Sequence, residues 1–412
     1  MAPSRRLVAA QLTSSLGDGA FIVTSALFFT RVVGLGVAEV GAALTTAWAA
    51  GFLAGAPVGR VADRFGLRRT ATVLSLGTAS ALALLVVVRS LPAFVAAVVL
   101  YGICQSGLGG VRQALVAVLV PAEERLPVRA RLQAAGNGGL AVGATLGGIA
   151  IAVGDEWAYL AVFGLDAVAF VAAAVVLHGL PKDGGARLRT PSASVLRDRP
   201  FVVVAALNAA MLLYMPMLSV ALPLWIASRT GAPEWTISVL FVLNTAGVVL
   251  GQVRVARRVH DTASASVAVG HAGVLFLLTC VAFAASGRVP GAAAVALLVL
   301  GALLQVVGEM LLASGFWAIA FALAPADRQG EYQGFFASGV AVARTVGPLL
   351  LTTLLLSGGT VGWLVLGLVF VLAAAVTPSA VRRAQGPRTD PSSRSSSAAS
   401  GGQADRPRRV TA

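Results

Sequence analysis

A short charged segment interrupts the apolar sequence early in the chain and decides how the rest is read. It runs Gly59-Arg60-Val61-Ala62-Asp63-Arg64-Phe65-Gly66-Leu67-Arg68-Arg69. Apolar runs flank it at about 37–58 and 70–88. Taken alone, this charged segment predicts a polar loop between two hydrophobic helices, with its arginines on the side of a membrane where positive charge is retained.

Composition places the charged segment in a membrane protein. Of the 412 residues, 57% are hydrophobic and only 12% are charged, about half the charged share of a typical soluble domain. Apolar runs long enough to cross a bilayer recur along the chain, and the first, from Leu7, is too long for the core of a signal peptide. The net charge of +14 does not predict nucleic-acid binding, because the arginines gather in alternate loops and in the tail.

The apolar runs predict twelve membrane-spanning helices. Their expected ranges are 7–30, 37–58, 70–88, 92–120, 132–153, 157–180, 200–227, 235–253, 264–285, 290–323, 332–356 and 361–376. Arginines are sparse in the odd-numbered loops, so both termini and the charged segment are expected in the cytoplasm. The localisation that follows is a multi-pass protein of the plasma (inner) membrane.

An internal repeat predicts how these helices are grouped. Pro325 follows Pro121 by 204 residues, and Gly347 follows Gly143 by the same interval. The fold class expected is an all-α membrane protein made of two pseudo-symmetric six-helix halves. The halves are predicted at 1–180 and 200–378, joined by a polar cytoplasmic linker at 181–199 and followed by a disordered cytoplasmic tail at 379–412.

The charged segment carries a family resemblance. Its order G-x-x-x-D-R-x-G-x-R-R resembles the signature loop between helices 2 and 3 of the major facilitator superfamily, and the resemblance covers residues 5 to 378. It implies a transporter whose halves rock about a mid-membrane site. It also implies a conformational latch near the start of helix 11, with Asp63 at that helix N-terminus and the arginines beside Glu123 or Glu124. The latch residues are Gly59, Asp63, Arg64, Gly66, Arg68 and Arg69.

A glycine-rich stretch in the fifth predicted helix is the second motif. Gly139, Gly143, Gly147 and Gly148 resemble the exporter motif of the same superfamily, with Ala144 in place of its usual proline. The alternative is generic close packing of helices through small residues. Segments 14–18 and 163–167 resemble the macrolide- and siderophore-exporter branch, whereas segment 101–107 lacks the arginine of the superfamily's helix 4 motif.

Four ionisable residues fall inside predicted membrane helices and are candidates for proton coupling. They are Asp18, Asp166, Glu309 and Arg344. Withdrawal from water favours a neutral carboxylic acid and a nearby arginine favours the carboxylate, so a site that alternates between the two binds and releases a proton. The alternatives are a structural hydrogen bond or packing contact for either aspartate, a Glu309–Arg344 ion pair between helices 10 and 11, and an anionic substrate held by Arg344.

Other polar or aromatic residues of the helices are candidates for a substrate cavity, although interhelical hydrogen bonding is the default role for about half of them. They are Gln11, Asn137, Asn208, Tyr214, Trp225, Asn244 and Gln305. No phosphate-binding loop, metal-ligand cluster or enzyme motif is found, and no cofactor is expected.

The sequence therefore predicts a secondary active transporter rather than an enzyme. It is expected to act as a monomer in the lipid bilayer and to export a small amphipathic molecule, such as a drug, antibiotic or siderophore, in exchange for protons. Import of a small nutrient remains an alternative, as does a lipid flippase or a sensor on the same scaffold.

Overall fold

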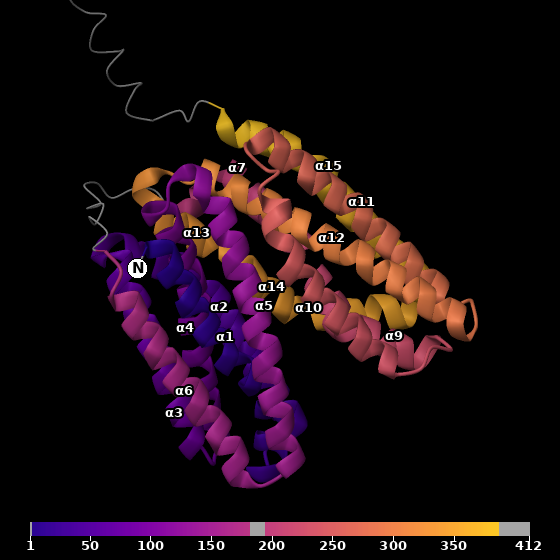
Figure 1. The fold of residues 1–412 in the computed structure, drawn as a ribbon, viewed down its shortest axis with the longest axis horizontal. Coiled ribbons are helices and arrows are strands. Elements are labelled where there is room, and N and C mark those ends of the chain that lie inside the picture. Colours follow the sequence, from indigo (N-terminus) through magenta and orange to yellow (C-terminus); the bar gives the residue numbers. More distant parts are fainter. Residues whose placement is uncertain (1, 182–193, 387–412) are drawn as a thin grey trace, which may run out of the picture.

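A computed structural model describes residues 2–181 and 194–386, and these parts are almost entirely helical (Figure 1). Within them, twelve spans are long and apolar enough to cross a membrane, which confirms the predicted number. The first half contains α1 (Pro3–Leu27), the π-helical turn η1 (Phe28–Val32), α2 (Val37–Phe65), α3 (Leu67–Val87), α4 (Leu91–Leu119), α5 (Ala122–Val153) and α6 (Glu156–His178).

The second half contains more breaks. Its elements are η2 (Val195–Arg197), α7 (Arg199–Met211), α8 (Tyr214–Pro216), η3 (Met217–Ala221), α9 (Leu222–Arg229), α10 (Trp235–Ala256), α11 (Thr262–Ser286), α12 (Gly291–Leu323), η4 (Ala326–Arg328), α13 (Gln329–Ala337), α14 (Gly339–Thr352), η5 (Thr353–Ser357) and α15 (Gly358–Gln385). The predicted continuous helix at 200–227 is broken because Pro216 and Pro223 supply no amide donor to the preceding turn.

Each half builds its own hydrophobic core. Phe163 and Phe170 are fully buried in the first core, which draws its residues from 7–180 and Phe321. Phe276 and Phe370 are fully buried in the second, which draws on 195–384. Many apolar side chains on the outside remain exposed, as expected of helices whose outer faces contact lipid rather than water.

The halves meet at one end of the molecule and diverge toward the other, so that the ribbon forms a V (Figure 1). The contacts join α2 to α13 and α14, and α5 to α10 and α12. The repeat is reproduced in space as well. Gly143 of α5 lies against α1, and Gly347 of α14 lies against Pro216 in the seventh span.

The charged segment is helical, and its prediction as a loop is wrong. Residues 59–65 form the last turns of α2, residues 67–69 begin α3, and only Gly66 departs from helical geometry, with φ of 100°. Glycine adopts this positive φ without the steric cost that a side chain brings. The charges therefore mark the end of the membrane-embedded part of two helices rather than the end of the helices.

Two further boundaries differ from the predictions. The basic stretch at 125–131 belongs to α5, which begins at Ala122. The tail predicted from 379 begins as the last turns of α15, where Ala380, Val381 and Ala384 are buried in the second core. Of the predicted linker, 182–193 lies outside the described residues, as does 387–412 of the predicted tail, whereas Val195 at the end of the linker is fully buried.

Candidate functional site

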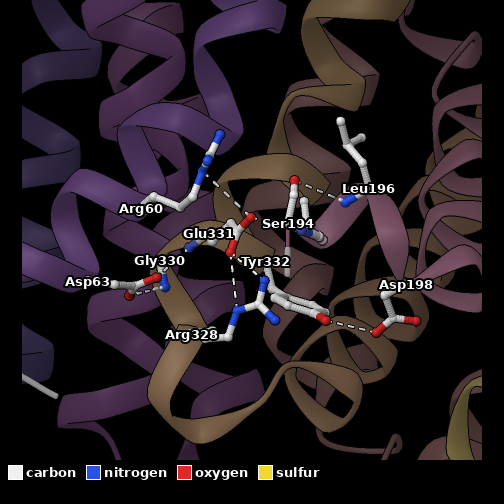
Figure 2. Close-up of polar contacts among 10 residues, drawn as sticks. Arg60, Asp63, Ser194, Leu196, Asp198, Arg328, Gly330, Glu331 and Tyr332 are labelled. Atoms are coloured by element: carbon white, nitrogen blue, oxygen red, sulfur yellow. Dashed lines mark hydrogen bonds and ion pairs between the residues drawn. The ribbon is translucent and has the colours of Figure 1, made fainter. Parts of the chain in front are cut away.

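The end at which the halves meet is built around the Asp63 carboxylate (Figure 2). Its Oδ1 accepts a hydrogen bond from the amide of Gly330 at 2.6 Å, and its Oδ2 accepts one from the amide of Glu331 at 2.8 Å. These amides belong to the first turn of α13, where backbone donors have no partner within the helix. A buried carboxylate here satisfies both donors and faces the positive end of the helix dipole.

Glu331 is the second buried acid of this contact. Its Oε2 accepts from Arg328 Nη2 at 2.6 Å, and its Oε1 accepts from the amide of Val195 at 2.8 Å. The Nε of Arg60 lies 3.7 Å from Oε1 (Figure 2). Glu331 thus connects α2 of the first half with two segments of the second half, since Val195 begins η2 and Arg328 ends η4, just before α13.

Close backbone contact accompanies these polar bonds. A methyl group added at Gly59 would overlap the carbonyl of Gly330 and lie 2.7 Å from Cα of Glu331. One added at Gly110 of α4 would lie 2.5 Å from Cα of Gly334. Glycine at these positions is what allows α13 to approach α2 and α4 closely enough for Asp63 to reach the helix N-terminus.

The arginines of the charged segment have other partners than the predicted Glu123 and Glu124. Arg60 pairs with Glu331, as described above. Arg68 donates from Nη1 to the carbonyl oxygens of His178 and Leu180, at 3.2 and 3.3 Å, and so caps the end of α6. Arg64 lies over the ring of Phe65, 5.5 Å from its centroid. Arg69 is exposed. The predicted acids lie at the start of α5, on a different helix from these partners.

Asp18 forms the core of a second polar cluster, within the first half. Its Oδ1 accepts hydrogen bonds from the hydroxyl of Tyr101 at 2.9 Å and from Nε2 of Gln105 at 2.6 Å. Both donors lie on α4, one helical turn apart, whereas Asp18 lies on α1. Segment 101–107, which lacks the arginine of the superfamily's helix 4 motif, therefore supplies the partners of Asp18.

Arg112 is the residue of this cluster that sequence reasoning missed. It lies on α4 two turns after Gln105, is 6% exposed, and its charge interacts with that of Asp18. Its Nη1 donates to Oε1 of Gln11, and Gln11 in turn donates to Ser15 Oγ at 2.8 Å. An arginine within an apolar run was the available signal. Gln11, predicted to line the cavity, is thus held by Arg112 inside this network.

Asp166 reaches the same cluster from α6. It is fully buried, and neither carboxylate oxygen has a hydrogen-bond partner among the described residues. A methyl group added at Gly17 would overlap Asp166 Oδ1, so the acid lies directly against α1 beside Asp18. The charges of Asp18 and Asp166 act on one another. Two of the predicted acids are thus brought together.

In the second half, Glu309 accepts a hydrogen bond from Nδ2 of Asn244 at 3.0 Å and another from the hydroxyl of Tyr214. Three predicted residues therefore meet here. The alternative ion pair between Glu309 and Arg344 is not formed. Arg344 lies instead over the ring of Trp48 on α2, 4.5 Å from the centroid, because its place on α14 faces the first half rather than α12.

Comparison with known families identifies the scaffold that carries these clusters. The family model for the Major Facilitator Superfamily matches residues 7–348. The chain belongs to this superfamily. The assignment makes it a transporter rather than an enzyme, and a multi-pass membrane protein. The comparison with curated protein sequences finds no match.

Solved structures of superfamily members share the fold at low sequence identity. The human organic anion transporter MFSD10 (TETRAN) is 17% identical with a TM-score of 0.67, and the alignment covers 92% of this chain and all of that one. A bacterial homologue of the iron transporter ferroportin, in an outward-facing state, is 16% identical with a TM-score of 0.71, covering 94% and 100%. The proton:xylose symporter XylE is 15% identical with a TM-score of 0.71, covering 92% and 95%.

The remaining residues that were predicted to line a cavity lie in different surroundings. Trp225 is wrong as a cavity residue: its Nε1 donates to the carbonyl of Phe283 at 2.9 Å and its ring packs edge-to-face on Trp363, inside the second core. Gln305 is fully buried with neither amide atom hydrogen-bonded to the described residues. Asn137 accepts from Gln133 on its own helix, and Asn208 is buried beside Gly339.

The glycines of the fifth helix divide into two groups within this fold. Methyl groups added at Gly139, Gly143 or Gly147 would meet the backbone of α1, at Leu12, Leu16 and Ala20. One added at Gly148 would meet no heavy atom within 4 Å. Three of the four predicted glycines therefore serve the close α1–α5 contact, and Gly148 does not. This contact fixes the helix on which Asp18 lies.

Proposed function

We propose that this superfamily member is a proton-coupled exporter of amphipathic small molecules that works by alternating access. The observation that carries the proposal is the placement of Asp18. It lies 15 residues after Pro3, about 23 Å along α1, and its carboxylate is held by Tyr101 and Gln105. Carboxylates at such depth are costly and occur where protons or substrates pass.

A charge interaction between the halves supports the coupling. Asp18 belongs to the first half and Arg344 to the second, and their charges attract one another. The guanidinium of Arg344 also lies over Trp48 of the first half. Protonation of Asp18 would remove one of these attractions and so favour separation of the halves at this level. Release of the proton would restore it, which links proton binding to rocking of the halves.

The latch supports the conformational part of the proposal. With the termini in the cytoplasm, as the arginine distribution suggests, the Asp63–α13 contact closes the cytoplasmic side and the V opens outward. Export is favoured by the resemblance of the α5 glycines to the exporter motif, and the small number of ionisable residues within the spans suits an amphipathic substrate. Import of a nutrient uses the same geometry in the opposite direction and is a possible outcome of the test.

The test is transport into everted vesicles, using a panel of lipophilic cations, macrolides and siderophores with and without a pH gradient. We expect gradient-driven accumulation by the native protein and its loss in Asp18→Asn, which still binds substrate. Asp155→Asn is the matched control, because Asp155 is exposed at the α5–α6 turn and its side chain accepts a hydrogen bond from nearby Trp157. Undiminished accumulation by Asp18→Asn would contradict proton coupling through this residue, and uptake only into right-side-out vesicles would indicate import.

A further inference from the structure

A groove on the outer surface of the second half lies outside the two polar clusters. It runs between α11 and α15, which lie side by side at the edge of the molecule (Figure 1), and has a volume of about 690 Å³. This is within the range of small-molecule sites. Most of its lining is small or apolar, with Val267, Gly270, Val274 and Ala375 as examples.

The groove has the depth of one membrane leaflet. On α11 its lining extends from Thr262 to Val274, twelve residues and therefore about 18 Å along the helix. The hydrocarbon core of a bilayer is about 30 Å thick, so the groove crosses slightly more than half of it. It starts at the first residue of α11 and the last turns of α15, at one end of both membrane-length spans.

Polar groups are concentrated at that end. Gln385 donates from Nε2 to Thr262 Oγ1 at 2.9 Å and bridges the two helices there. Arg382 lines the groove, is exposed, and forms no ion pair with any described residue. Its planar guanidinium matches the geometry of a phosphate. His271 also lines the groove, deeper in, about 14 Å along α11 from Thr262.

One nearby acid, Asp261, would repel an anion at this end, but its carboxylate is hydrogen-bonded to the first turn of its own helix. Asp261 precedes α11 and accepts hydrogen bonds from the amide and the hydroxyl of Ser264, both at 2.7 Å. These bonds hold the pKa of Asp261 below its ordinary value, so it remains a carboxylate. Its charge is directed at the positive end of the α11 dipole rather than at Arg382.

We propose that the groove binds one anionic phospholipid. Its phosphate lies at Arg382 and Gln385, and an acyl chain follows the apolar lining past His271 toward Val274. A lipid fits better than a second protein helix because the charge is confined to one end, the depth equals one leaflet, and the surroundings are the bilayer itself. The bound lipid would fill the space between α11 and α15 that side chains leave open.

The test is lipid binding to the purified full-length protein in detergent, followed by native mass spectrometry. Synthetic phosphatidylglycerol and phosphatidylcholine are the probes. We expect phosphatidylglycerol to bind more tightly than phosphatidylcholine, because the two share the phosphate but the choline of the second places a positive charge beside Arg382. Arg382→Gln should weaken phosphatidylglycerol binding roughly tenfold, since a hydrogen-bonded charge contact is worth roughly a factor of ten or more, and should remove the preference. Arg383→Gln is the matched control, because Arg383 is exposed on the same turn and does not line the groove.

A second pair of variants tests the groove by filling it. A side chain at Gly270 would enter open space, so Gly270→Leu should abolish binding of both lipids while the protein stays folded. Gly164→Leu adds the same side chain into open space on α6 and should leave lipid binding unchanged. Unaltered phosphatidylglycerol binding in both Arg382→Gln and Gly270→Leu would overturn the proposal. Full competition by soluble glycerol phosphate would overturn it too, because it would indicate a site for a free anion.

Discussion

At the scale of single residues, Asp63 shows how one carboxylate can hold two halves of a protein together. We predict that Asp63→Asn shifts the equilibrium toward the state in which this end is open. An amide has one acceptor oxygen and places an NH2 group against a backbone donor, so one of the two charge-assisted bonds is lost and the other weakened. A loss of about 1.5 to 3 kcal/mol corresponds to a roughly ten- to hundredfold shift.

The measurement is the turnover rate, together with the rate at which a cysteine replacing Ser338 is alkylated. Ser338 is buried against Gly55 of α2 in the closed contact and cysteine is close to it in size, so labelling reports opening. Arg69→Gln, an exposed position of the same segment, should behave like the native protein. A changed order of preference among substrates in Asp63→Asn would argue against a latch and for a binding role.

Single residues are also where sequence reasoning succeeded and failed most clearly. The resemblance of the charged segment placed Asp63 at the start of helix 11, and the structure has it there. Trp225 was wrongly predicted to line the cavity, and Arg112 was not predicted at all, for opposite reasons. A tryptophan satisfies its one donor on a backbone carbonyl and becomes core, whereas an arginine in an apolar run draws its partner from α1, a choice that no local pattern encodes.

At the scale of helices, the glycines of α5 control how closely it approaches α1. We predict that Gly143→Ala lowers the thermal stability and impairs transport, because the added methyl group overlaps the carbonyl of Leu16 and lies 2.9 Å from the amide of Ala20. Overpacking of this kind costs about 1 to 3 kcal/mol. Unfolding temperature in detergent and transport in vesicles are the measurements.

Gly148→Ala is a control from the same motif, since its methyl group meets open space and should leave both measurements near the native values. Equal losses in the two variants would mean that the α1–α5 contact does not explain the motif, because helix propensity alone favours alanine over glycine. The helix boundaries that were predicted wrongly have a common cause at this scale. Charges at 59–69 and 125–131 mark where a helix leaves the lipid, and a helix continues past that point as long as its next turn finds packing.

At the scale of the whole molecule, two separate cores joined by a small set of polar and glycine contacts predict rigid-body motion of the halves. We expect spin labels at Val153 and Trp235, which lie on different halves at the diverging end, to report two distances whose populations change with pH or substrate. Labels at Val87 and Val153, both in the first half, should report one unchanged distance because their helices, α3 and α5, contribute to the same core. Asp63→Asn should move the first pair toward its shorter distance, since opening one end closes the other. If the pair within one half changes as much as the pair between halves, the transition is a rearrangement of helices inside a half, and the latch would then act on helix packing rather than on rocking.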